Sequence, residues 1–135
     1  MSRQLGTENE IIPRIASGFG GGIGGTGAVC GAVTGAVMAI GLEHGRDFEV
    51  EDRLGAWRLA QEFRRRFEAE MGHIGCRELT GADLSTEEGR KQYRSSDRPI
   101  YVCLRAGGIA YEIVLDLLKE AEEPVATPLS NGTES

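Results

Sequence analysis

A glycine-rich run over residues 18–35 constrains the fold of this chain more than any other segment. It reads GFGGGIGGTGAVCGAVTG and places Cys30 at the start of an expected helix of small residues. Glycine has no side chain, so backbone and thiol groups can approach other atoms closely there. The free N–H groups and the dipole at a helix start favour a thiolate over a thiol. Together these features predict redox chemistry or metal ligation at Cys30.

The rest of the sequence predicts an all-α fold. Apolar residues recur at helical spacing, and no long two-residue alternation calls for a sheet. We expect a compact bundle of about four to five helices, with a glycine-rich loop between the first two. The helices are expected over about residues 7–18, 27–44, 51–71, 85–93 and 99–122, with one helical turn within 73–81. The 27–44 helix is apolar nearly all round, as in a central buried element.

The third helix carries the clearest apolar stripe. Its members are Ala56, Leu59, Ala60, Phe63, Phe67 and Met71, with Trp57 and Leu54 beside them. Their spacing predicts that the aromatic side chains belong to the core.

Length and charge limit the organisation and partners of the chain. Its 135 residues fit one helical redox-type domain over 1–122, followed by a disordered tail at 123–135. The net charge of −6 argues against nucleic acid as the main partner.

The longest apolar stretch, 28–42, is shorter than the roughly 20 residues that span a bilayer, so no stable membrane insertion is expected. No export signal is visible at residues 1–7, which predicts a cytoplasmic location.

Three cysteines, Cys30, Cys76 and Cys103, each lie near an expected helix or turn start. A reducing cytoplasm favours catalytic or metal roles over structural disulfides, although cysteine is also a common small core residue. The main hypothesis is that two of them cycle between dithiol and disulfide with an unknown redox partner protein. The pair is either Cys76 with Cys103 or Cys30 with one of them. Cys30 is favoured as the attacking thiol because the adjoining glycines leave it accessible.

Other functions fit the same residues. His73 and Cys76 have metal-ligand spacing, and with Cys30 and Cys103 they give a Cys₃His set for zinc, while the cysteines alone would suit an iron–sulfur cluster. A protein without any cofactor, with buried cysteines and a purely structural or interaction role, is the third alternative. The small-residue face of the 27–44 helix would suit a homodimer.

The glycine run also matches the GxGxxG nucleotide fingerprint at residues 20–25. No strand precedes the match, which argues against nucleotide binding. An anion pocket at the start of the following helix is a better interpretation. Its backbone would be contributed by Gly22, Gly24, Gly25 and Gly31.

Segments 16–24, 29–42, 63–67 and 76–81, followed by Cys103, resemble in order and spacing the redox-active family named for its C_GCAxxG_C_C cysteine pattern. The resemblance covers roughly residues 14–120. It implies a small α-helical protein with redox activity and carries over to Cys30, Cys76 and Cys103. The family pattern includes an earlier cysteine on an additional N-terminal helix, and this chain has none before Cys30. A four-thiol mechanism therefore cannot run unchanged in one chain, and a second subunit would cover apolar surface that the missing helix exposes.

Overall fold

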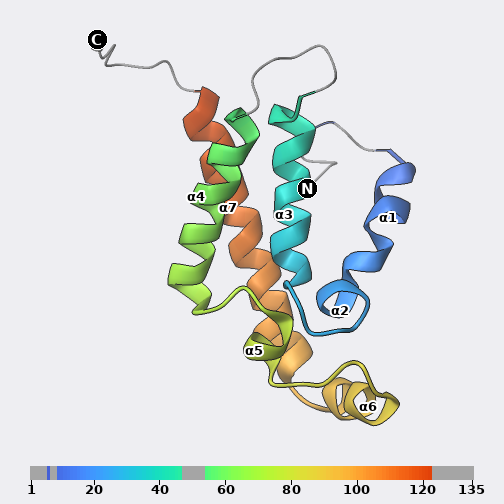
Figure 1. The fold of residues 1–135 in the computed structure, drawn as a ribbon. Helices are drawn as coiled ribbons and strands as arrows, with labels where there is room; N and C mark the ends of the chain where they lie inside the picture. Colours follow the sequence, from blue (N-terminus) through green and yellow to red (C-terminus); the bar gives the residue numbers. More distant parts are fainter. Residues whose placement is uncertain (1–5, 7–8, 47–53, 123–135) are drawn as a thin grey trace.

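The computed structural model describes residues 6, 9–46 and 54–122, and this part of the chain is helical without any strand (Figure 1). The all-α prediction is therefore confirmed. Short elements come first: α1 (Ile11–Ala16), a 3₁₀ turn (Ser17–Phe19) and α2 (Gly20–Ile23). They are followed by α3 (Gly31–His44), α4 (Gly55–Met71), α5 (Cys76–Thr80), α6 (Glu87–Ser95), a π-helical turn (Pro99–Leu104) and α7 (Arg105–Glu122).

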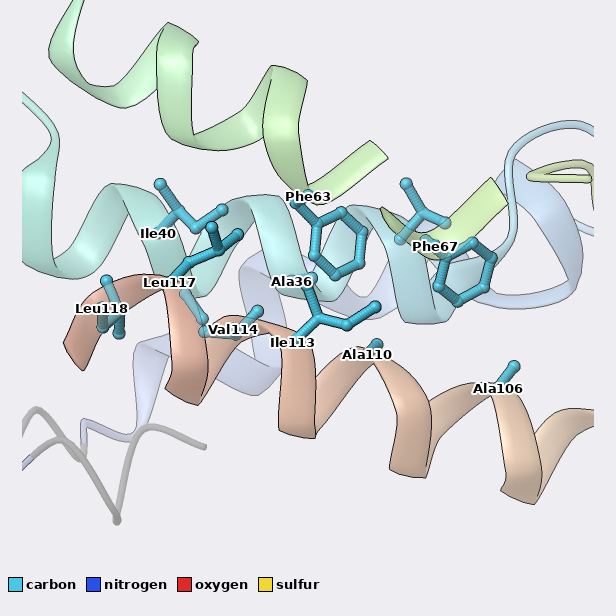
Figure 2. Close-up of a cluster of buried hydrophobic side chains, with 12 residues drawn as sticks. Ala36, Ile40, Phe63, Phe67, Ala106, Ala110, Ile113, Val114, Leu117 and Leu118 are labelled. Atoms are coloured by element: carbon cyan, nitrogen blue, oxygen red, sulfur yellow. The ribbon is translucent and has the colours of Figure 1, made fainter. Parts of the chain in front are cut away.

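The core lies between α3, α4 and α7, the three long helices that run side by side in Figure 1. Figure 2 shows Phe63 and Phe67 of α4 pointing between the other two helices. Both rings are fully buried, and their centroids lie 5.7 Å apart in a stacked arrangement. The small side chains of Ala106 and Ala110 face them from α7, which leaves room for the aromatic rings.

Two expectations about burial need correction. Trp57 is 64% exposed, and Leu54 is exposed as well, although both were expected beside the core stripe. The α3 helix is buried only on the side that faces α4 and α7, and it leaves Val37 and Leu42 exposed. Helix α1 does not provide a second core on the exposed side of α3, because α1 contributes no buried residue.

Three helix starts lie about four residues later than expected: α1 begins at Ile11, α4 begins at Gly55, and α3 begins within the glycine run. Helix α3 begins at Gly31 rather than near residue 27, because Gly27 has a positive φ of 77° and Cys30 is extended. The last helix starts at Pro99 as expected, but its first turn is π-helical. The helical turn within 73–81 is present as α5.

One expectation falls outside the described residues, the disordered tail at 123–135. Within the described part of the chain, no helix is both long enough and apolar enough to cross a membrane.

The core predicts a sharp contrast between two aromatic residues of α4. Phe63→Ala removes a fully buried ring and should lower the free energy of unfolding by about 3–5 kcal/mol. Trp57→Ala, the matched control on the same helix, should change it by less than about 1 kcal/mol, since the indole is mostly exposed. Urea unfolding followed by circular dichroism measures both values. Equal losses in the two variants would contradict this assignment of the core.

Candidate thiol site

All three cysteines line one cavity of about 300 Å³ at the end of the bundle where α2, α5 and α6 lie. They come from three separate parts of the chain: the start of α3, the start of α5 and the π-helical turn before α7. The remaining lining residues are Gly21, Gly22, Gly31, Ala32, Leu79, Thr80, Leu84, Tyr93, Val102 and Ala106. The fold therefore assembles a thiol cluster from residues more than 70 positions apart, Cys30 and Cys103.

A short backbone ladder pairs the segment before Cys30 with the segment before Cys76. Val29 and Gly75 form an isolated antiparallel bridge. The Cys30 N–H donates to the carbonyl of Ile74 at 2.7 Å, and the Cys76 N–H donates to the carbonyl of Ala28 at 2.6 Å. Each cysteine directly follows a bridged residue, so both side chains lie on the same face of the ladder.

The glycine loop covers this pair with bare backbone. Residues 21–25 all have positive φ, so most of α2 is itself left-handed and the left-handed turn continues to Gly25. A Cβ atom added at Gly22 would lie 2.6 Å from the Cβ of Cys76 and 2.6 Å from the backbone nitrogen of Ala28. The close approach expected of the glycine run is therefore real at Gly22, where no side chain fits.

The Cys76 thiol is the most enclosed of the three. Cys76 is 8% exposed, whereas Cys30 and Cys103 are half-buried. Burial raises the pKa of the Cys76 thiol, and repulsion from the neighbouring Cys30 and Cys103 raises it further. The hydrogen bond with the Thr80 side chain opposes this effect on the pKa of Cys76.

Cys30 is the N-cap residue of α3, as the sequence suggested, but its side chain makes no capping hydrogen bond to the first turn. Its backbone carbonyl accepts the first hydrogen bonds of the helix, as is usual for an N-cap residue. The Cys30 carbonyl accepts hydrogen bonds from the N–H groups of Val33 and Thr34. This half-buried residue is one of those that line the cavity.

Tyr93 is a site residue that the sequence did not single out. Its hydroxyl lies 2.7 Å from the Cys103 sulfur. Burial, followed by this hydrogen bond, raises the pKa of the Tyr93 hydroxyl well above its usual value. One signal was available: Tyr93 is the only large apolar side chain in the otherwise polar helix α6, so it had to be the residue that faces inward.

The other predicted site residues are divided between two cavities. Gly22 and Gly31 line the thiol cavity, whereas Gly24 and Gly25 line an adjoining one. His73 is exposed and does not line the thiol cavity. Among the residues that the structure describes, no three or more His, Cys, Asp or Glu side chains are arranged to hold a metal ion. The geometry therefore lends no support to a Cys₃His site.

Fold and site together define a small all-α protein with three free thiols around one cavity. The chain belongs to the family described as "Putative redox-active protein (C_GCAxxG_C_C)", whose sequence model matches residues 1–117. No curated protein and no solved structure gives a match. The resemblance to this family noted from the cysteine and glycine blocks is thus confirmed.

The packing at Gly22 can be tested against a neighbouring glycine. Gly24 has a similar positive φ, but open space surrounds the position that a Cβ would take. Gly24→Ala should therefore cost only the left-handed backbone strain, about 1–2 kcal/mol, whereas Gly22→Ala should cost about 1–3 kcal/mol more because of the clash with Cys76. Urea unfolding measures the difference. Equal costs for the two variants would show that the loop does not pack on Cys76.

The enclosure of Cys76 predicts an order of thiol reactivity. Iodoacetamide should label Cys76 at least about tenfold more slowly than Cys30 in the folded, reduced protein, because only thiolates react and this thiol is buried. The labelling rate of Cys76 should also keep rising with pH beyond about 8.5, where an ordinary thiol is half ionised, since the pKa of Cys76 is raised. Peptide mass spectrometry gives each rate. Fast labelling of Cys76 that levels off near this pH would refute the prediction.

Proposed function

We propose that this protein catalyses thiol–disulfide exchange, with Cys30 as the attacking thiol and Cys76 as the resolving thiol. The observation that carries the proposal is the convergence of the cysteines on one cavity, with Cys30 and Cys76 on the same side of the Val29–Gly75 bridge. Membership of a family described as redox-active supports this class of chemistry.

The reaction needs two thiols and one substrate disulfide. The Cys30 thiolate attacks one sulfur of the substrate, forms a mixed disulfide and releases the other substrate sulfur as a thiolate. The Cys76 thiolate then attacks the Cys30 sulfur and releases the second substrate thiolate. The protein ends with a Cys30–Cys76 disulfide and has passed two electrons to the substrate, and a dithiol reductant reverses the sequence.

Burial and electrostatics favour this order of events. A substrate can approach the half-buried thiol of Cys30 more easily than the buried thiol of Cys76. Charge on Cys30 is one of the causes that raise the pKa of Cys76. Once Cys30 is bound in a mixed disulfide it carries no charge, so Cys76 loses its proton more easily when its attack is needed.

The contact with Tyr93 argues for leaving Cys103 out of the first pair. The Cys103 sulfur lies 2.7 Å from the Tyr93 hydroxyl, and a disulfide to Cys103 would remove the thiol proton and leave only a weak acceptor in this contact. Within residues 9–46 and 54–122, the Cys30 side chain makes no capping hydrogen bond that would restrain it in the same way.

Three matched cysteine variants test the proposal. The reduced protein is mixed with bis(hydroxyethyl) disulfide, a neutral substrate, and the products are followed by stopped flow and mass spectrometry. Cys30→Ser should slow the exchange by at least about a hundredfold, because the attacking thiolate is lost. Cys76→Ser should react but remain as a mixed disulfide on Cys30.

Cys103→Ser is the control, and it should still form the Cys30–Cys76 disulfide. Unchanged exchange in Cys30→Ser would exclude Cys30 as the attacking thiol. A wild-type disulfide that includes Cys103 would exclude the proposed pairing.

A further inference from the structure

A second cavity, of about 450 Å³, adjoins the thiol cavity. The glycine loop forms one of its walls and helix α6 forms another. Its lining residues are Gly20, Gly21, Gly24, Gly25, Leu84, Arg90, Tyr93 and Arg94. Three of these, Gly21, Leu84 and Tyr93, also line the thiol cavity, so the two spaces share a wall.

Helix α6 contributes two arginines to the lining of this second cavity. Arg90, Tyr93 and Arg94 are spaced so that they lie on one face of the helix. The guanidinium of Arg90 donates a hydrogen bond to the backbone carbonyl of Leu84 at 3.0 Å, which fixes it at the rim. The cavity lining includes no acidic residue, so neither charge is neutralised from within.

The arginines in the described part of the chain fall into two groups, those with an ion pair and those without one. Arg64, Arg65, Arg66 and Arg77 each form an ion pair with a carboxylate. Arg90 and Arg94 form none in this part of the chain, although the protein as a whole has a net charge of −6. Two unpaired guanidinium groups beside an apolar, glycine-lined wall provide donors for an anion.

We propose that this second cavity binds the carboxylate of a small anionic disulfide or thiol. The sulfur of this ligand would extend past the residues that line both cavities and reach the cysteines. The volume of the cavity is that of a small-molecule site rather than a protein-docking surface. The inference rests on the proposed thiol–disulfide exchange and names the class of substrate that it acts on.

Exchange kinetics with disulfides of different charge test the proposal. Wild-type protein is compared with the Arg90→Gln/Arg94→Gln double variant, using dithiodipropionate (anionic), bis(hydroxyethyl) disulfide (neutral) and cystamine (cationic). Wild type should prefer the anionic disulfide, and the double variant should lose about tenfold or more of its rate with that substrate alone. The preference should weaken with added salt.

Lys91→Gln is the matched control, because it removes the same charge from the same helix outside the cavity. It should change all three rates by less than about twofold. Arg94→Gln alone serves as a second variant, because Arg94 makes no hydrogen bond or ion pair in the described residues whose loss could unfold α6.

A non-reactive dianion separates this inference from the redox proposal. Thiodipropionate has no disulfide bond, and it should shift the amide resonances of Gly24 and Gly25 in wild type but not in the double variant. Exchange with the neutral disulfide but without any anion preference overturns only the anionic-substrate inference. Binding of thiodipropionate without any exchange overturns only the redox function. Absence of thiodipropionate binding, or binding that the double variant retains, overturns the assignment of this cavity.

Discussion

The contact between the bare backbone at Gly22 and the side chain of Cys76 is the constraint on which the site depends. It requires a left-handed glycine turn, and that turn sets the path of the chain into the Val29–Gly75 bridge. The bridge then fixes where α3 and α5 begin, each at or beside a cysteine. Since α3 is also one of the three core helices, the thiol cavity and the hydrophobic core share one rigid element.

The sequence was a good guide wherever structure follows from local periodicity. The stripe containing Phe63 and Phe67 predicted the α4 face correctly, because helical spacing alone decides which side chains share a face. The exposure of Trp57 was not predictable in this way, since it depends on which neighbour covers that edge of the helix. The start of α3 was placed too early because composition does not reveal that Gly27 is left-handed.

Part of the candidate site could also be predicted from the sequence. The local settings of Cys30, Cys76 and Cys103 suggested a shared role, and the structure places all three on one cavity. Tyr93 was missed because its contact with Cys103 joins residues from two elements whose relative placement is tertiary. The two arginines of α6 were missed for a related reason: net charge averages over the whole chain, whereas a small ligand responds to the few charges that line its cavity.

The number of thiols bears directly on the mechanism. The family name lists four cysteines and this chain has three, but a two-electron exchange uses only an attacking thiol and a resolving thiol. Under the proposed function Cys30 and Cys76 supply these two thiols, so that proposal does not require a fourth cysteine. Cys103, whose sulfur lies 2.7 Å from the Tyr93 hydroxyl, is not needed for this two-thiol exchange.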